Sequence, residues 1–323
     1  MKQILFYLAI LAVAIVFGIC LGTDRFTPVQ AFNAIVSSSP SALKTILLDI
    51  RLPRVLAAFL VGAGLALTGA VLQSLVRNPL ADSYTLGISG GSLLGICFGI
   101  LWGRTLAVPL LAFAGAVGAV ILVLSAGAVR RLSNPTLILL GVVLNFILSS
   151  FVLFILALAR NEKFQEAFFW MLGDISFFDE RLLVAAAIII PVAGIILACH
   201  SRALDVLSLG EEKAATLGLD VETVRRILLI VVSLVTGMCV SIGGMVGFVG
   251  LIIPHLVRMI FGASHRTVIP GAFILGGSFL ILCDTLARSL MPPIEIPVGV
   301  ITGFFGGIFF LIILLRTSCN EVW

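Results

Sequence analysis

The chain alternates between long apolar runs and short polar connections along almost its whole length. A helix that spans a bilayer needs roughly 20 apolar residues, and ten runs are close enough to that length to be predicted as spans. They cover residues 4–22, 55–76, 84–102, 107–127, 136–158, 182–199, 227–246, 248–262, 267–287 and 297–315. The pattern therefore predicts an all-α polytopic membrane protein, with residues 1–323 in a single transmembrane domain and both termini on the same side.

Two of these predicted spans are poorly separated, because residues 227–257 contain no Asp, Glu, Lys or Arg. We place the break between them on residues that disfavour a continuous helix. These residues are Gly243, Gly244, Gly247, Gly250 and Pro254.

Two polar connections are predicted to contain short helices. In residues 23–50, Thr27-Pro28 is a suitable helix start, and the apolar residues that follow share one face, which predicts a surface helix. Residues 201–226 form the longest hydrophilic stretch and are predicted as two short helices joined at a glycine stop. Several leucines make this stretch too apolar for a solvated connector, so it is expected to dock on a partner.

Composition supports a membrane protein and excludes several other classes. Hydrophobic residues make up 60% of the chain and charged residues 11%, which leaves too much apolar surface for a soluble domain. The net charge of +4 is modest and its basic residues are scattered, so nucleic acid is not an expected partner. The six cysteines contain no CxxC pair, and we expect packing roles for them, with no metal or cofactor bound by this chain.

An internal repeat supports the number of spans. Three glycines or prolines recur 175 positions later in the chain: Gly62 and Gly237, Gly69 and Gly244, and Pro79 and Pro254. The two copies, at about 51–158 and 226–316, begin five spans apart and must cross the membrane in opposite directions. This is the inverted-repeat plan of many transporters, with a pathway expected at the repeat interface.

Ionisable residues are expected away from the middle of the membrane. No Asp, Glu, Lys, Arg or His is expected at the centre of a span, and His200, His255 and His265 are expected near inner span ends. A proton-coupled carrier needs a titratable group at mid-depth, so this pattern disfavours one. Uncharged groups can still coordinate sodium, and an ion-coupled secondary transporter therefore stays an alternative.

Two enzyme signatures can be tested on the sequence itself. Residues 87–91, Gly-Ile-Ser-Gly-Gly, match a serine-hydrolase motif, but no histidine is expected opposite Ser89 to act as its base. An intramembrane serine hydrolase that uses Ser89 is kept as a second alternative. The dipeptide Gly-Lys is absent, so there is no phosphate-binding P-loop, and any ATP must be hydrolysed by another subunit.

Four charged residues gather at predicted span ends. Arg51 and Arg54 lie one helical turn apart at the edge of an apolar run, where they are expected to face water or a partner. Asp284 and Arg288 are spaced to pair on one helix face, and Arg288 would keep spare donors.

Two further polar positions have open interpretations. Asn78-Pro79-Leu80 either ends a helix or forms a gate between two spans. Asn145, inside a predicted span, either makes an interhelical hydrogen bond or lines the pathway.

Orientation rests on a weak charge bias. With the amino terminus inside, eleven Lys or Arg residues lie inside and nine outside. The positive-inside rule therefore favours cytoplasmic termini by a small margin.

Five motifs in order resemble the FecCD-type permease family, the membrane subunits of ATP-driven importers for iron-siderophore, haem and vitamin B12. They are RLPR (51–54), LVGAGLALTGAVLQSLVRNPLADSYTLGISGG (60–91), LSLGEEKAATLG (207–218), GFVGLIIPHLVR (247–258) and PIEIPVGVITGFFGG (293–307). The resemblance covers nearly the whole chain.

The resemblance implies a complex in the bacterial cytoplasmic (inner) membrane. Two permease subunits of ten helices each, identical or close paralogues, would surround a central pathway. Two cytoplasmic ATPase subunits would hold ATP and Mg, and a soluble or lipid-anchored binding protein would deliver substrate outside. This chain would then be a transport subunit rather than an enzyme, with iron-siderophore as the first expected substrate and haem or vitamin B12 next.

The resemblance also implies roles for individual residues. Arg51, Arg54 and Arg288 match arginines that receive glutamates of the binding protein, and Asn78 and Leu80 match an inner, cytoplasmic gate. Residues 204–222 match the coupling helices that dock on the ATPase subunit. The residues that carry this last likeness are Leu209, Gly210, Glu211, Ala214, Leu217 and Gly218.

Overall fold

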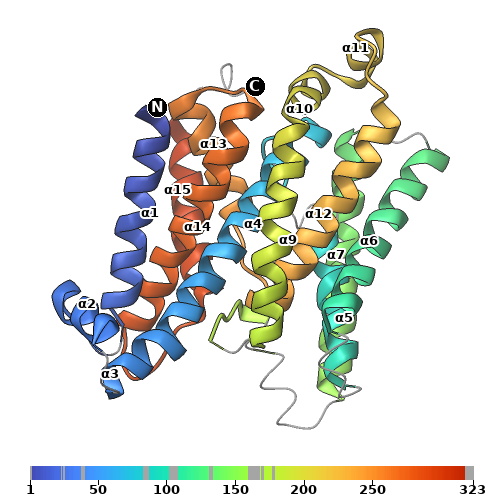
Figure 1. Ribbon diagram of the computed structural model, residues 1–323. Coiled ribbons are helices and arrows are strands. Elements are labelled where there is room, and N and C mark those ends of the chain that lie inside the picture. Colours follow the sequence, from blue (N-terminus) through green and yellow to red (C-terminus); the bar gives the residue numbers. More distant parts are fainter. Residues whose placement is uncertain are drawn as a thin grey trace.

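The computed structural model describes most of the chain. Its described residues are 2–22, 24, 26–37, 41–82, 87–101, 108–130, 134–158, 168, 171–176 and 179–316. Within these ranges the fold is a bundle of long helices without a named strand (Figure 1), which confirms the all-α class.

Each of the ten predicted spans contains a long helix. Their bounds are α1 Lys2–Cys20, α4 Leu52–Val76, α5 Ile88–Leu101, α6 Val108–Arg130, α7 Asn134–Ala157, α9 Glu180–Cys199, α12 Val221–Gly243, α13 Val249–Phe261, α14 His265–Ser289 and α15 Val298–Arg316. Six helical segments are long and apolar enough to cross a membrane, and shorter apolar helical stretches lie in α5, α6, α13 and α15.

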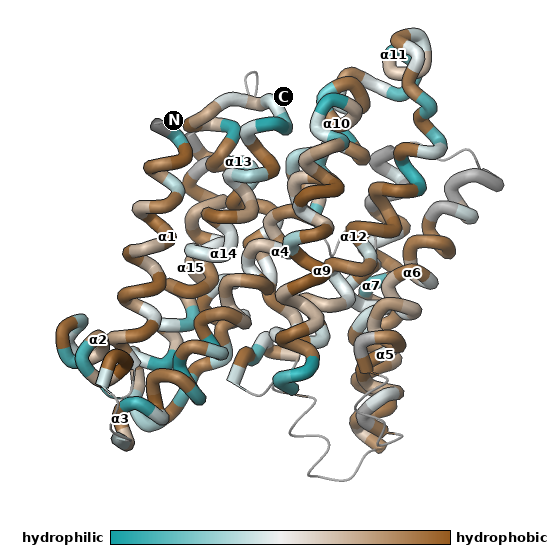
Figure 2. Tube along the Cα trace, viewed as in Figure 1, coloured by the Kyte–Doolittle hydropathy of each residue, from teal (hydrophilic) through white to brown (hydrophobic). Residues whose placement is uncertain are grey.

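The two ends of the bundle carry different short helices. One end, here called the termini end, holds the start of α1 and the end of α15, together with α10 (Ser201–Ser208) and α11 (Glu211–Thr216) (Figure 1). The opposite end holds α2 (Pro28–Val36), α3 (Ala42–Thr45) and the π-helical stretch η1 (Ile46–Arg51). Between these ends the long helices are mostly hydrophobic (Figure 2), as a chain that crosses a bilayer requires.

The short helices predicted from the polar connections are confirmed. Thr27 caps α2 by accepting a hydrogen bond from the Gln30 backbone N–H, and the Gln30 side chain accepts one from Thr27. This is a capping box. The 201–226 stretch forms the two expected helices, which are joined at Gly210 with a φ of +116°, a conformation that favours glycine.

Some predicted boundaries differ from the structure. The helix that leads into α4 begins at Ala42, well before residue 55. The chain breaks between α12 and α13 at residues 244–248, where Gly244 and Phe248 have φ values of +64° and +68°. Gly250 and Pro254 lie inside α13, so their expected part in the break was wrong. Pro254 cannot donate to the Gly250 carbonyl one turn earlier, and the Gln73 side chain of α4 donates to that carbonyl instead, at 3.2 Å.

Helix α4 is the centre of the bundle. Every residue from Leu60 to Ser74 is buried, and α14, α12, α13 and α9 all pack around it. Its small residues permit this, because a Cβ atom at Gly62 would overlap the Gly276 carbonyl of α14, and one at Gly69 would overlap the Gly250 carbonyl of α13. Close backbone approach at small residues is how helices associate in lipid.

The packing of the two repeat copies is reciprocal. Helices α4 and α12 run in opposite directions (Figure 1). Gly62 of α4 packs on α14. Its counterpart, Gly237 of α12, lies against the α6 backbone, where an added Cβ atom would be 3.2 Å from Phe113. An inverted repeat requires this exchange of neighbours, although the repeat boundaries themselves stay a prediction.

The contact between α4 and α13 can be tested with Gly69→Ala. The added methyl group overlaps the Gly250 carbonyl, so the two helices must separate, and overpacking of this kind destabilises by about 1–3 kcal/mol. We expect a lower thermal midpoint for the detergent-purified protein. Gly118→Ala on α6 is the matched control, because nothing lies within 4 Å of its added methyl group. Equal midpoints for the two variants would contradict the close packing of α4.

Candidate functional site

At the opposite end, Arg54 of α4 is held by two carboxylates. Its Nε and Nη2 donate to Asp284 of α14 at 2.9–3.2 Å, and its Nη1 donates to Glu295 at 2.7 Å. The Asp284 residue is 1% exposed. This geometry is the bidentate arginine–carboxylate pairing that forms strong charge-assisted hydrogen bonds, and it joins α4 to α14 and to the turn before α15.

The Glu295 carboxylate also joins a third segment. Its Oε2 accepts a hydrogen bond from Ser176 Oγ at 3.1 Å, in addition to the one from Arg54. Burial on its own would raise the pKa of the Glu295 carboxyl, but the hydrogen bonds from Arg54 and Ser176 outweigh burial and hold that pKa below its ordinary value. Glu295 is therefore an anion that bridges the loop before α9 and the start of α4.

The other two arginines cap the end of α1. Arg51 donates to the Ile19 carbonyl at 2.6 Å and to the Asp24 carbonyl at 2.5 Å, and its guanidinium lies 4.5 Å from the centre of the Phe26 ring. Arg288 donates to the Gly18 carbonyl. The last carbonyls of a helix have no partner within that helix and carry partial negative charge, so both arginines stabilise the end of α1.

The predicted pair of Asp284 and Arg288 is present as an ion pair only. Arg288 Nε lies 3.4 Å from Asp284 Oδ2, yet this nitrogen makes no hydrogen bond. We attribute the difference to geometry, because the Asp284 oxygens already face Arg54. The contact is electrostatic, and the main partner of Arg288 is the end of α1.

The structure therefore corrects the expectation that these arginines face outward. Arg51 and Arg288 are each 4% exposed, and both bind within the chain. A buried charge needs partners to offset its lost hydration, and the α1 carbonyls and Asp284 supply them. Only the contact between Arg54 and Glu295 reaches the surface, where the Glu295 side chain is 37% exposed. A docking role for the three arginines stays a prediction.

At the termini end, the predicted gate residues form a tight turn. Arg77 ends α4 with a φ of +51°, and the Asn78 backbone N–H donates to the Gln73 carbonyl at 3.1 Å. The Asn78 side chain accepts a hydrogen bond from the Leu80 N–H at 2.9 Å, as asparagine does in turns. Leu80 is 39% exposed. The turn is fixed directly to the end of α4, while its role as a gate stays a prediction.

Two of the predicted coupling residues are exposed and apolar. Leu209 and Leu217, on either side of α11, are 57% and 66% exposed, and α11 projects from the bundle (Figure 1). Ala214 is fully buried, so its side chain supports α11 from within. Gly210 is also buried, and a Cβ atom there would lie 3.1 Å from Arg77 Nη1. The coupling loop is therefore next to the turn that follows α4.

The predictions for Ser89 and Asn145 are resolved in part. Asn145 Oδ1 accepts a hydrogen bond from the Gly90 backbone N–H at 2.8 Å, and the Ser89 hydroxyl lies 3.5 Å from the same oxygen. An amide oxygen is not a general base, so this contact does not activate Ser89. Asn145 makes the interhelical bond that was one of its two interpretations, and its place in a pathway stays a prediction.

One histidine lies where none was expected. His200 and His265 are at helix ends, but His255 is in the middle of α13. Helix α13 is shorter than a full span, so its midpoint lies close to its inner end. The sequence prediction placed His255 at that inner end and did not recognise that the same position is the centre of the helix. The argument against a proton-coupled carrier is weaker for this reason.

Sequence reasoning also missed two polar residues near the end of α4, Gln73 and Ser74. Gln73 accepts a hydrogen bond from Arg258 of α13 and donates to the Gly250 carbonyl at 3.2 Å. The available signal was a pair of polar residues at the end of an otherwise apolar run. Buried polar groups must find hydrogen-bond partners, which predicts contacts to neighbouring helices.

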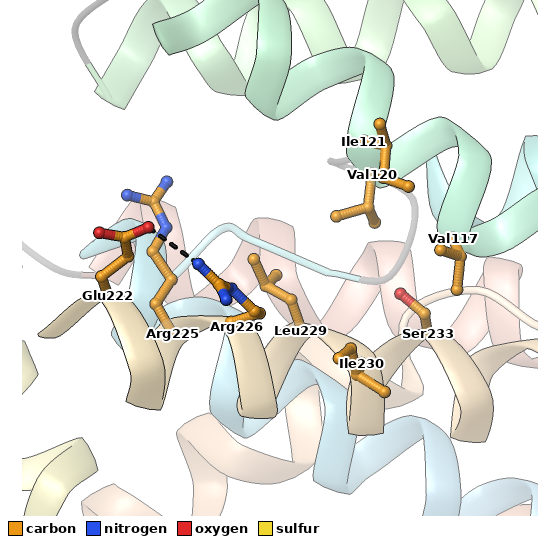
Figure 3. Close-up of a pocket in the computed structure, with 9 residues that line it drawn as sticks. All are labelled: Val117, Val120, Ile121, Glu222, Arg225, Arg226, Leu229, Ile230 and Ser233. Carbon is orange, nitrogen blue, oxygen red and sulfur yellow. Dashed lines mark hydrogen bonds and ion pairs between the residues drawn. The ribbon is translucent and has the colours of Figure 1, made fainter. Parts of the chain in front are cut away.

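A groove of about 440 Å³ lies between α6 and α12. Figure 3 shows its lining: Val117, Val120 and Ile121 from α6, and Glu222, Arg225, Arg226, Leu229, Ile230 and Ser233 from α12. Its two arginines are paired, Arg226 with Glu222 at 2.9 Å and Arg225 with Glu211 at 3.1 Å. The remaining walls are almost entirely apolar, so the candidate site is at the two ends of α4 rather than in this groove.

Comparisons with known proteins agree with this arrangement. The FecCD transport family model matches residues 10–316. The hemin transport system permease protein HmuU of Yersinia pestis is 37% identical over 292 residues, which cover 87% of this chain and 86% of that protein. The vitamin B12 import system permease protein BtuC of Escherichia coli is 34% identical over 313 residues, which cover 96% of this chain and 93% of that protein.

A solved structure has the same fold. It is an inward-facing conformation of an ABC transporter assigned to the metal-chelate type, with a TM-score of 0.83 and 29% identity, covering 98% of this chain and 99% of that one. The chain therefore belongs to the FecCD transport family, as a multi-pass permease subunit of an ATP-binding cassette importer of the metal-chelate, haem and vitamin B12 class.

Proposed function

We propose that this chain forms half of a membrane pathway that imports an iron-siderophore chelate into a bacterium, powered by ATP and Mg in a separate subunit. An importer permease of this class works with ATPase and substrate-binding partners. In this proposal a second copy or a close paralogue completes the pathway. The ATPase docks at α10 and α11 on the cytoplasmic side, and a binding protein delivers the chelate at the opposite end.

The observation that carries the proposal is the exposure of Leu209 and Leu217, on either side of the projecting helix α11. Unlike the apolar faces of the long helices, these leucines flank a short helix that lies beyond the mostly hydrophobic part of the bundle (Figure 2) and begins with exposed Glu211 and Glu212. Lipid would not cover them there, and exposed apolar groups outside the membrane indicate a protein partner.

The substrate within this class is proposed from the size and chemistry that the relatives share. Hemin and vitamin B12 permeases match the chain at 37% and 34% identity, so identity does not separate these two substrates. Iron-siderophore, haem and vitamin B12 are all large metal chelates that a binding protein can recognise in solution. We place iron-siderophore first, with haem and vitamin B12 next, and an ion-coupled carrier as the alternative mechanism.

The assembled importer can be tested in proteoliposomes. We expect uptake of radiolabelled ferric siderophore only when the permease, its ATPase, its binding protein and ATP are all present. Uptake of haem or a corrinoid in its place would change the substrate but not the mechanism. Uptake by the permease alone, driven by a proton or sodium gradient, would contradict the proposal.

The coupling surface can be tested with Leu209→Glu and Leu217→Glu. Each change adds a charge to an exposed apolar contact, and a residue central to an interface contributes about 2 kcal/mol or more to binding. We expect loss of the ATPase subunit when the complex is purified through a tag on the permease. Ile294→Glu, at an equally exposed residue of the opposite end, is the control and should retain the ATPase. Retention by all three variants would remove the assigned role of α11.

Docking at the opposite end can be tested with Glu295→Gln. The change removes the carboxylate that occupies Arg54 Nη1, so we expect binding-protein affinity to rise by about tenfold, within the range of close interfacial charge pairs. Titration in nanodiscs measures this affinity. Glu222→Gln, at an arginine-paired glutamate of the termini end, is the control. Unchanged or weaker binding in the Glu295 variant would argue against a partner carboxylate at Arg54.

A further inference from the structure

Helix α14 begins without a cap of its own. Its N-cap residue, Ser264, makes no capping hydrogen bond with its side chain. Asp205 of α10 supplies the missing partner, because its Oδ1 accepts from the His265 backbone N–H at 2.8 Å and its Oδ2 accepts from Ser264 Oγ at 3.2 Å. A carboxylate at this position also interacts favourably with the partial positive charge of the helix start. The coupling segment therefore caps α14 from outside.

The same carboxylate continues into the core through the His265 ring. His265 Nδ1 lies 2.6 Å from Asp205 Oδ1, and its Nε2 lies 2.6 Å from the Ser74 hydroxyl oxygen of α4. A carboxylate can only accept, so Nδ1 carries the proton and donates to Asp205. The single proton of the Ser74 hydroxyl has two acceptors within reach, Nε2 of the neutral ring and the Ala70 carbonyl at 3.0 Å. His265 and Ser74 are 3% and 4% exposed. These contacts form a chain of hydrogen bonds across three helices, buried at Ser74 and His265 and partly open at Asp205, whose side chain is 35% exposed.

The charge state of Asp205 fits this position. Partial burial on its own would raise the pKa of the Asp205 carboxyl, but the hydrogen bonds from the His265 backbone and ring and from Ser264 outweigh burial and lower that pKa. Asp205 is therefore an anion at neutral pH, and it attracts both the helix start and the ring. Hydrogen bonds to a charged group are roughly twice as strong as neutral ones.

The chain of contacts ends at the turn that holds the proposed gate. The Ser74 and Gln73 carbonyls accept hydrogen bonds from the Arg77 and Asn78 backbone N–H groups at 3.3 and 3.1 Å. Gln73 in turn binds Arg258 and the Gly250 carbonyl of α13. A displacement of α10 that moves Asp205 must therefore either break the part-buried hydrogen bonds to His265 or move the start of α14 and the end of α4 with it.

These three residue types also form hydrolase triads, but the geometry here excludes that chemistry. The Ser74 oxygen lies between the His265 ring and the Ala70 carbonyl, which is 3.0 Å away. At 4% exposure the hydroxyl has no space beside it for a substrate carbonyl. The arrangement transmits position rather than performing catalysis.

We infer that Asp205, His265 and Ser74 are positioning residues that transmit movement of the coupling helix α10 to the end of α4 and its Asn78 turn. The inference rests on the proposed function, since it assumes that an ATPase subunit moves α10. A rigid two-state link between sites requires contiguous contacts whose alternatives leave polar groups unpaired. The contacts from Asp205 to Ser74 are contiguous, and breaking them leaves the backbone N–H and the ring Nδ1–H of His265 unpaired.

The test measures substrate imported per ATP hydrolysed by the complete reconstituted importer. We expect Asp205→Ala and Ser74→Ala each to lower this ratio by about tenfold, while ATP hydrolysis continues. A factor of this size is typical of the coupling between two linked sites. The double variant should be no worse than either single one, because both changes break the same chain. Asp205→Asn keeps acceptor oxygen for His265 and should restore most of the ratio.

Two controls separate transmission from simple damage. Asp179→Ala removes a carboxylate outside the coupling segment that caps its own helix, α9, through the Arg181 N–H at 2.8 Å. Ser241→Ala removes a buried helix serine that binds the Gly237 carbonyl at 2.7 Å. Both controls should keep the wild-type ratio.

The outcomes are distinct for the two proposals. A ratio unchanged in Asp205→Ala and Ser74→Ala, or an equal loss in the controls, would overturn the positioning role. Wild-type complex that shows no ATP-driven uptake at all would overturn the proposed function and the inference that rests on it.

Discussion

The structure depends on one helix that is enclosed by other helices on every side. Helix α4 is buried without interruption from Leu60 to Ser74, over a helix about 37 Å long. Such enclosure is possible only where neighbouring backbones can approach closely, and Gly62 and Gly69 provide that space. The consequence is mechanical. No single neighbour can move far along α4 without disturbing the others, because tightly packed interiors transmit strain.

The same constraint explains where the polar residues lie. The middle of α4 offers no water, so hydrogen-bonding groups collect near its two ends, with Arg54 at one and Gln73 and Ser74 at the other. At both ends a side chain from one helix caps another helix: Arg51 and Arg288 cap the end of α1, and Asp205 caps the start of α14. Helix termini that are buried among other helices must be satisfied in this way. The caps therefore join the helices into one body while leaving short, exposed segments free to bind partners.

Much of this arrangement could be predicted from the sequence, and the misses have physical causes. Apolar runs of membrane length predicted the ten long helices, and Gly210 predicted the turn between the coupling helices. The burial of Arg51 and Arg288 was missed because sequence does not show that the α1 carbonyls lie within reach of these two side chains. Ser74 and His265 were missed because they are 191 positions apart in the chain, and their contact exists only once α4 and α14 pack. Pro254 was expected to break a helix, but the carbonyl that it leaves without a helix partner, Gly250, accepts a hydrogen bond from Gln73 of α4, a contact that sequence does not show.

The central claim is that α11 and the Arg54 end of α4 face opposite sides of the membrane. The ATPase then acts on one side, and the binding protein delivers substrate on the other. The most direct test places single cysteines at Leu217 and at Ile294, both exposed, in a variant in which Cys199 and Cys319 are replaced by serine. Intact bacteria are then treated with a membrane-impermeant maleimide. The account predicts labelling of the Ile294 position in intact cells and of the Leu217 position only after permeabilisation. Labelling of the Leu217 position in intact cells would contradict it.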